Sequence, residues 1–501
     1  MNLYINCVSL QINVIIINMK KNDKNNISSE VNKTDNLLSA KELHEKMLGF
    51  SINYFMIDLK NDRKSFYAVK SEEMNEYWLC RSGKTLNYII DGELDKAWEL
   101  IKEIPDDSPF YMLKLGLTFV HPEVTWKEFI EILKYLKDND LSLKSVVLTA
   151  GRPYLLNGFN DFSRIGPILP KIKNQFIDFM KTVYEPQLCP YIYNLCLAEY
   201  YYQINNLIDA EMLVSSTIKK FDIDGERRII FSSLYLQSKI LLANGKTVNT
   251  ESFIKNMRKL AGEAGNAEFS YNIDAAEILF ALYDGKLSFV YDWLETNAPD
   301  EFSDFNMLDL YRYFIKMKCY IAIKQYASVI ALTEKLRPLL EGGRRHIDLC
   351  HLDLMLALCL FASKKKELAC EALSRALKIA RKYQYLRLIA DEGEPMLHLL
   401  VYYIKNKGEN PFLMKILEMT RNMAIRHPLY MKSVTEGGET FTPMEVDILL
   451  LLEQGKSKDE ISEYFFITIN TVKYHLKNIY SKLGANSPHL AVWNAKLRGI
   501  I

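Results

Sequence analysis

The side chains best suited to chemistry lie near the carboxyl end of the chain, between Thr468 and Gly484. In a helix, with about 100° between successive residues, one narrow stripe of this segment is apolar and the opposite side is polar. The apolar stripe contains Val472, Leu476, Ile479 and Leu483. The polar side contains Lys473, Tyr474, Lys477, Asn478 and Ser481. Cations, a phenol and an amide on one exposed face suit contacts to the phosphates and base edges of a DNA major groove.

Two further helices are expected before this one. Thr442-Pro443-Met444-Glu445 is a capping box with proline at the first helical position, and it predicts a helix that runs to about Gln454 and is ended by Gly455. Ser457-Lys458-Asp459-Glu460 is a second capping box and predicts a short helix through about Ser462. In both boxes the hydroxyl and the carboxylate can accept hydrogen bonds from exposed amides at the helix start.

The candidate binding helix is therefore the third of four. Thr468 is placed to cap its start and Gly484 to end it, and Ser487-Pro488 predicts a fourth helix that reaches Gly499. A tight turn between the second and third helices predicts a helix-turn-helix arrangement in which the third is the recognition helix.

Charge is distributed unevenly within this module. The chain of 501 residues has 63 Lys and Arg against 62 Asp and Glu, a net charge of +1, which argues against binding nucleic acid or membrane by bulk charge. Residues 439–467 carry seven acids and two lysines, a net −5, whereas residues 468–501 carry five cations and no acid. A solvated charged face is the ordinary explanation of such a run, but the complete absence of acids favours a face that meets DNA.

Residues from about 440 to 501 resemble the DNA-binding domain of the LuxR family. The opening Leu-Thr-Pro-x-Glu of that family is present as Phe441-Thr442-Pro443-Met444-Glu445, and its Gly-x-Ser-x-x-Glu-Ile occupies 455–461. Thr-Val-Lys-x-His-x-x-x-Ile occupies 471–479, and Lys-Leu-Gly occupies 482–484. The departures are Met444, where the family often has Arg, Ser462, where it usually has Ala, and Tyr474 at a variable reading position, which leaves the target sequence open.

The resemblance implies that Lys473, Tyr474 and Lys477 lie in the groove, with Thr471 and Lys482 nearer the phosphates. It also implies dimer contacts through the final helix, from Pro488 to Arg498. The resemblance and the exposed helix face together predict six DNA-binding residues, which are Thr471, Lys473, Tyr474, Lys477, Asn478 and Lys482.

The middle of the chain reads as one amphipathic helix after another, with almost no strand-like alternation. Four segments share a turn followed by a helix with small or apolar residues at a recurring spacing, which resembles the tetratricopeptide repeat (TPR). Small residues are needed where paired helices approach closely. The four sets are Ala97, Ile101 and Ile104; Ala210, Val214 and Thr217; Val329, Thr333 and Leu336; and Ala369, Leu373 and Ala376. Such an array offers a surface for a protein or a small ligand, although it can also be a structural spacer.

Residues 385–396 resemble the end of the repeat region in MalT-like regulators; the residues alone predict a helix stopped by Gly393 and restarted around Pro395. MalT-like regulators usually carry an ATPase before the repeats, and this chain contains Ser82-Gly83-Lys84-Thr85. A phosphate-binding loop needs a glycine at the position of Trp78. We therefore expect this motif to form a helix start in the first repeat, and we expect no nucleotide cofactor.

Other candidate sites are weaker. Cys350, Cys359 and Cys370 lie near His346 and His351 in the sequence, but their spacing matches no zinc pattern, so core positions and no metal are expected. The tyrosines at 200, 201, 311 and 313 are interpreted as helix packing. Residues 1–18 are apolar but lack a basic region and a cleavage site, and translation could start at Met1 or Met19. No run is long enough to span a membrane.

Together these features predict an all-α protein, a TPR-like α-solenoid followed by a small four-helix LuxR-type helix-turn-helix domain. The expected divisions are a disordered segment at 1–37, the repeat region at 38–424, a linker at 425–438 and the DNA-binding domain at 439–501. We expect a cytoplasmic transcription regulator and not an enzyme, because no catalytic constellation is present. It would bind promoter sites in double-stranded DNA as a homodimer, and its repeats would sense an unknown ligand or protein. The alternative is a protein-protein interaction adaptor whose terminal module does not bind DNA.

Overall fold

The computed structural model describes most of the chain from residue 37 onward. All regular secondary structure in this described part is helical, which confirms the predicted all-α class. The predicted disordered segment, apart from residue 37, and the second half of the predicted linker lie outside the described residues, as do Ile104, Thr442, Gly484, Arg498 and Gly499. The described residues are 37–48, 61–102, 152–158, 161–181, 186–220, 227–246, 248, 250–262, 267–302, 304–431, 441, 443–465, 467–483, 485–497 and 501.

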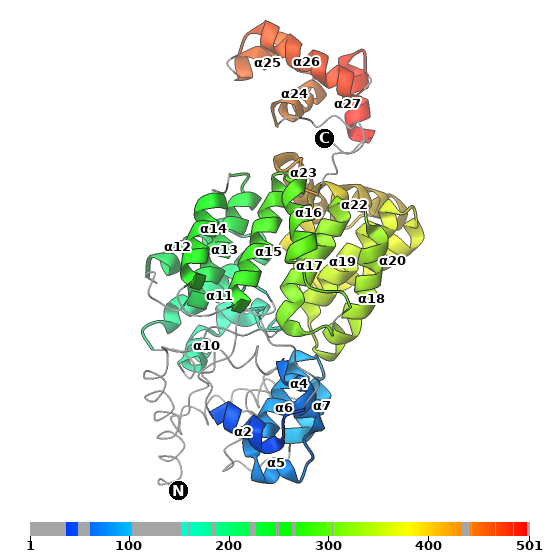
Figure 1. Cartoon of the computed structure of the whole chain (residues 1–501). Helices are drawn as coiled ribbons and strands as arrows, with labels where there is room; N and C mark the ends of the chain where they lie inside the picture. Colours follow the sequence, from blue (N-terminus) through cyan, green and yellow to red (C-terminus); the bar gives the residue numbers. More distant parts are fainter. Residues whose placement is uncertain are drawn as a thin grey trace.

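Within the described residues, five helices precede the main repeat region and dock on one end of it (Figure 1). The backbone of Gly92 touches Gly342, and Arg344 forms an ion pair with Asp95 at 3.0 Å, so residues far apart in the sequence meet there. The five helices are α2 (Ala40–Leu48), α4 (Arg63–Ala68), α5 (Glu73–Glu76), α6 (Trp78–Ile90) and α7 (Leu94–Ile101).

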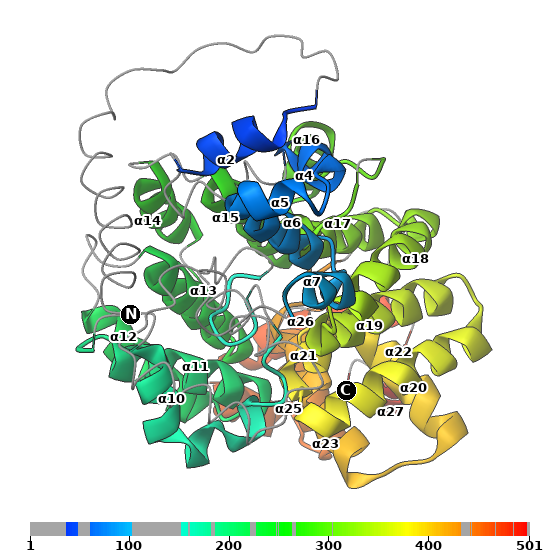
Figure 2. The same cartoon turned by 90° about the horizontal axis from the view of Figure 1, so that it is seen from below.

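The repeat region is a series of antiparallel helix pairs that stand side by side (Figure 1). Seen along the helices, it curves around the short helix α21 (Figure 2). Its helices are η1 (Gly166–Lys171), α10 (Lys173–Met180), α11 (Cys189–Gln203), α12 (Leu207–Lys220), α13 (Arg227–Ala243), α14 (Thr250–Gly262), α15 (Ala267–Tyr283), α16 (Leu287–Thr296), η2 (Met307–Asp309), α17 (Leu310–Ala322), α18 (Tyr326–Gly342), α19 (His346–Ala362), α20 (Lys366–Tyr383), α21 (Leu386–Ala390), α22 (Gly393–Lys407) and α23 (Pro411–Arg426).

One turn geometry ends many of the helices in the described residues, both first and second helices of the pairs. A residue with positive φ follows the helix, and the next amide bonds back to the carbonyl five residues earlier, as Asn206 does to Tyr201 at 2.8 Å. This bond satisfies a carbonyl that the helix end would leave unpaired. The positive-φ residues at these turns are Gly92, Asn205, Gly245, Gly285, Lys324, Arg344, Lys364 and Gln384.

The predicted small and apolar residues of the second helices are buried at every position that the structure describes. Ala210 and Ala376 have no exposed surface, and Thr217 and Thr333 satisfy their hydroxyls by donating to their own helix at 3.0 and 2.9 Å. The TPR-like helix pairing is therefore confirmed at the described positions of all four sets. Tyr311 and Tyr313 are buried as well, in agreement with the packing interpretation.

The helix start expected at the motif 78–85 is present, because α6 begins at Trp78; Lys84 donates to the carbonyls of Tyr67 and Val69 at 3.2 and 2.9 Å. One local prediction needs correction. Gly393 does not stop a helix, because α21 already ends at Ala390 and α22 begins at Gly393 itself. The break between the two helices lies at Asp391 and Glu392.

The four carboxyl-terminal helices form a separate small core. They lie beyond α23, at the opposite end of the repeat region from the first five helices, and Ile425 of α23 packs against their core (Figure 1). None of the helices in the described residues is both long and apolar enough to traverse a bilayer. The four helices are α24 (Pro443–Glu453), α25 (Lys458–Phe465), α26 (Ile469–Leu483) and α27 (Pro488–Leu497).

Candidate nucleic-acid interface

The start of α25 is fixed by its capping box. The Ser457 amide donates to the Glu460 carboxylate at 2.8 Å, and the Glu460 amide donates to the Ser457 hydroxyl at 3.2 Å. These bonds, with the ammonium of Lys456, hold the pKa of Glu460 at about 2. The predicted capping box is confirmed, and the helix runs to Phe465, slightly beyond the predicted end at Ser462.

The recognition helix α26 has the predicted start and the predicted buried stripe. The Thr468 hydroxyl accepts the Thr471 amide at 3.2 Å, and the helix ends at Leu483, directly before Gly484. Because the stripe packs into the small core against α24 and α25, the rotation of α26 about its own axis is fixed. The buried residues of the helix are Val472, Leu476, Ile479 and Leu483.

The predicted DNA-binding side chains Lys473, Tyr474, Lys477 and Asn478 lie on the opposite, solvent-facing side of α26. Lys473 and Lys477 are exposed, one helical turn apart, and neither forms an ion pair within the described residues. The Tyr474 side chain between them is 63% exposed, and Asn478 is partly exposed. Within the described residues Lys473 and Lys477 form no ion pair and the exposed Tyr474 lies between them, so all three side chains can reach a nucleic acid.

Lys482 differs from the other predicted contacts. Its ammonium lies 2.7 Å from the Glu445 carboxylate, which is 2% exposed, and it also sits 5.4 Å from the centre of the Phe441 ring. Lys496 is likewise paired, with Glu453 at 2.6 Å. Two of the five cations counted in residues 468–501 thus neutralise acids of the preceding half. Among the described cations of residues 468–501, the two that form no such pair, Lys473 and Lys477, lie on the exposed face of α26.

Helix α27 has an exposed apolar face, and its individual residues were not predicted from the sequence. Trp493 is 57% exposed, and Leu490 lies partly exposed on the same helix. Ala491 and Ala495 point to the core instead. Asn494 donates to the Leu483 carbonyl at 3.0 Å and so satisfies the end of α26. An exposed tryptophan on a rigid helix is a ready contact for a second protein surface.

Four of the five cysteine and histidine residues considered as metal ligands lie within helices, and His346 is the first residue of α19. Cys350, Cys359 and Cys370 are buried, and the Cys350 thiol donates to the Ala376 carbonyl at 3.3 Å. His351 stacks on Phe314 with ring centres 4.5 Å apart, and its burial lowers its pKa to about 4. The core interpretation of these cysteines is confirmed. Within the described ranges, no group of three or more His, Cys, Asp or Glu residues could hold a metal ion.

Comparison with known proteins supports both halves of this organisation. The family of bacterial regulatory proteins called luxR matches residues 439–494, and the MalT-like TPR region matches residues 175–406. The chain joins a MalT-like TPR region to a luxR-family domain. The luxR-family match covers α24, α25 and α26 completely and most of α27, so the exposed face of α26 lies inside it.

Curated relatives match the luxR-family domain and the residues around it. The response regulator protein VraR of Staphylococcus aureus is 41% identical over 78 residues, both in strain Mu3 and in strain NCTC 8325. The match covers 16% of this chain and 34% of the relative, so the chain spans about a third of the length of the curated relatives it matches. The similarity therefore covers one part of each protein and not the full length of either.

Proposed function

We propose that this protein is a sequence-specific DNA-binding transcription regulator. The observation that carries the proposal is the exposed face of α26, where Lys473 and Lys477 flank Tyr474 without any internal ion pair in the described part of the domain. The buried stripe directs this face outward, and the luxR-family match supports its use on DNA. The two lysines suit phosphates, while Tyr474 and Asn478 suit base edges of a major groove.

Thr471 and Lys482 would lie at the edge of this interface. The Thr471 hydroxyl is 2.9 Å from that of Thr468 and can turn toward a phosphate. Lys482 can reach DNA only by sharing its ammonium between a phosphate and Glu445. We expect its contribution to affinity to be smaller than that of Lys473 or Lys477.

On promoter DNA the protein would act as a homodimer. The exposed Trp493 and Leu490 on α27 offer an apolar face on the domain itself. Two domains held together read two half-sites, and the second contact is made at high effective concentration. The site of action is the cytoplasm, where bacterial DNA is accessible.

The repeat region would supply the signal, by binding a ligand or a protein partner. The structure supports this role because the turn that follows α23 packs into the repeat region before the chain continues to α24. Tyr430 in this turn stacks on Tyr283 of α15 with ring centres 4.2 Å apart. A conformational change inside the repeat region can therefore be transmitted to the residues that connect it to the luxR-family domain.

Binding of the full-length chain to promoter and random duplexes, measured by fluorescence anisotropy over a range of salt, tests the proposal. Lys473→Ala and Lys477→Ala should each weaken binding and reduce the slope of log K against log salt by roughly one. Lys405→Ala, an exposed lysine on α22, is the matched control and should leave the slope unchanged. Equal affinity for promoter and random DNA, with no effect of the α26 variants, would favour the adaptor instead.

A further inference from the structure

A groove near the end of the repeat region lies between α20, α22 and the start of α23, and we call it the basic groove. It has a volume of about 470 Å³, within the roughly 300–1,000 Å³ that small-molecule sites in proteins occupy. Five residues of α20 form one side of it, and Tyr403 of α22 with the first turn of α23 forms the other. Its size therefore suits a small molecule.

Three cations of α20 line the basic groove, and none of the described lining residues is acidic. Lys378, Arg381 and Lys382 are spaced by three and four residues, so they share one face of the helix. All three are exposed, and none forms an ion pair within the described residues. Lys382 lies 5.0 Å from the centre of the Tyr383 ring, a contact that leaves its charge in place. Because like charges at this spacing repel one another, an anion in the groove would stabilise the helix.

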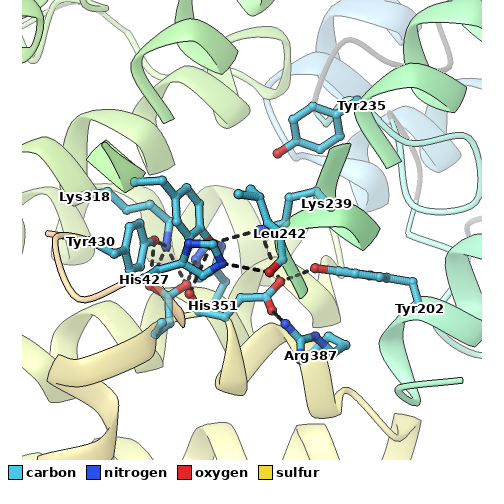
Figure 3. A network of polar contacts seen from close by, with 12 residues as sticks. Tyr202, Tyr235, Lys239, Leu242, Lys318, His351, Arg387, His427 and Tyr430 are labelled. Atoms are coloured by element: carbon cyan, nitrogen blue, oxygen red, sulfur yellow. Dashed lines mark hydrogen bonds and ion pairs between the residues drawn. The ribbon is translucent and has the colours of Figure 1, made fainter. Parts of the chain in front are cut away.

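The interior of the repeat region has the opposite arrangement (Figure 3). Three cations line a cavity of about 50 Å³ there, together with Tyr430, and each of the three is paired with a carboxylate. The pairs are Lys239 with Asp391 at 3.1 Å, Lys318 with Glu392, and Arg152 with Asp348. The fold thus supplies its own counterions inside the cavity, whereas the described residues supply none in the basic groove.

The basic groove also contains a hydrogen-bond acceptor. The Ser374 hydroxyl donates to the Cys370 carbonyl at 2.7 Å, so its oxygen is left to accept the proton of the Tyr403 hydroxyl, 2.9 Å away. The oxygen of Tyr403 then has no donor of its own within the described part of the chain. A hydroxyl group of a bound molecule can donate to it.

Amide and apolar groups complete the lining. Asn410 caps α23, because its side-chain oxygen accepts the Leu413 amide at 3.0 Å, and its NH₂ group remains to donate to a ligand oxygen. Leu377 and Leu413 line the groove and are otherwise buried, whereas Phe412 is partly exposed. The Phe412 ring can pack against the apolar part of a ligand. The groove therefore combines positive charge, polar groups of both kinds and an aromatic surface.

We propose that the basic groove binds a phosphate monoester of a hydroxylated ring compound, a sugar phosphate or a nucleoside monophosphate. A phosphate monoester carries about −1.5 to −2 charges at pH 7 and three acceptor oxygens, which suit three cations better than the single charge of a carboxylate. A ring hydroxyl donates to Tyr403, and the ring packs against Phe412. This assignment names the signal of the repeat region, so its regulatory part rests on the proposed function.

Helix α23 connects the basic groove with the residues that lead to the luxR-family domain. Its first turn lines the groove, and its 16 residues span roughly 24 Å. Beyond its far end, His427 Nε2 donates to the Leu242 carbonyl at 2.7 Å, and the Tyr430 hydroxyl accepts a hydrogen bond from Lys318 at 3.0 Å (Figure 3). A ligand that draws α20 and the start of α23 together shifts the helix against these contacts. Occupancy of the groove thereby alters DNA affinity.

Calorimetric titration of the full-length chain at constant ionic strength tests the site. The probes are glucose 6-phosphate and adenosine 5′-monophosphate, and the matched comparisons are glucose, adenosine and sodium phosphate. We expect saturable binding of at least one ester, about tenfold or more tighter than that of its unphosphorylated parent and of inorganic phosphate. The ester that binds more tightly identifies the ligand as a sugar or a nucleoside derivative. Absence of binding by both esters, or equal binding of inorganic phosphate, would overturn the proposal.

Substitutions locate the site within the chain. Lys378→Ala combined with Arg381→Ala should weaken ester binding about tenfold or more without lowering the Tm of the ligand-free protein, because both side chains are exposed and unpaired within the described residues. Tyr403→Phe should weaken ester binding and leave inorganic phosphate unaffected, because only the ester has a hydroxyl to donate. Lys365→Ala, at the other end of α20, is the matched control. Wild-type affinity in the double variant would contradict this location.

DNA binding supplies a separate readout. The ester should shift the DNA dissociation constant of the wild-type chain, and Tyr430→Phe should reduce this shift while the ester still binds. Ester binding without any shift would retain the site in the groove and overturn the coupling through α23. A chain that binds the ester but no DNA would leave the site in place and contradict the proposed function alone.

Discussion

The ammonium of Lys482 on α26 lies 2.7 Å from the carboxylate of Glu445 on α24, and the carboxylate is almost completely buried. This pair joins the first helix of the small domain to the recognition helix. Together with the apolar stripe, this pair therefore sets the orientation of α26. The main role of Lys482 is structural, and its predicted contact with DNA is secondary.

Glu445→Gln should destabilise the small domain by about 2–3 kcal/mol. The change leaves the Lys482 ammonium with a neutral partner, and the loss is below that of a fully buried pair because Lys482 is partly exposed. Urea unfolding followed by Trp493 fluorescence measures the effect. If Glu445→Gln combined with Lys482→Met is no more stable than Glu445→Gln alone, the Lys482 charge facing a neutral side chain is not the cause of the loss.

Tyr474→Ala should change which sequence is preferred more than it changes overall affinity. A side chain that contacts base edges contributes about 1–3 kcal/mol of discrimination at the positions it reads, whereas phosphate contacts are independent of sequence. Selection of bound sequences from a random pool, for wild type and variant, measures this. Ser481→Ala, at another exposed position of α26, should leave the preferred sequence unaltered.

Trp493→Ala should separate dimer formation from DNA contact. The variant loses the largest exposed apolar side chain of α27, so sedimentation should show less dimer and binding to a paired site should lose its cooperativity. Affinity for a single half-site should be unchanged, because Trp493 lies on a helix other than α26. A paired site bound as cooperatively as by wild type would place the dimer contact elsewhere.

Glu199→Gln should flatten the dependence of stability on pH between about pH 5 and 8. The folded protein keeps Glu199 protonated because burial raises its pKa to about 8, whereas the unfolded chain ionises near the ordinary value. In this window the folded state holds more protons, so stability falls as pH rises. Thermal unfolding at several pH values should show this fall in wild type and a smaller one in Glu199→Gln. Glu367→Gln, at an exposed position, should follow wild type.

The sequence predicted those features that depend on neighbours within one helical turn. The Ser457 and Glu460 capping box and the buried stripe of α26 follow from spacings of three and four residues, and both are present. The small residues of the repeats were predictable for the same reason. The individual contacts of the predicted binding residues with DNA remain predictions.

Contacts between segments that are distant in the sequence could not be predicted. Lys482 and Glu445 are 37 residues apart, and no local pattern indicates that they pair. The cavity unites Lys239 and Lys318, which lie on two different helices, with Arg152 and Tyr430, which lie in non-helical segments, and none of the four stands out in the sequence. Such sites depend on the curvature of the whole solenoid, which short-range periodicity does not encode.

The pairing of Lys482 with Glu445 and of Lys496 with Glu453 has a kinetic consequence. Because these cations are neutralised, the other described cations of residues 468–501, Lys473 and Lys477, lie on α26, whereas α25 carries Asp459, Glu460 and Glu463 against Lys458. The domain is therefore an electric dipole, and the field of a DNA duplex exerts a torque on it during diffusion. Substitutions of the α25 acids should alter the association rate at low salt and leave the dissociation rate nearly unchanged.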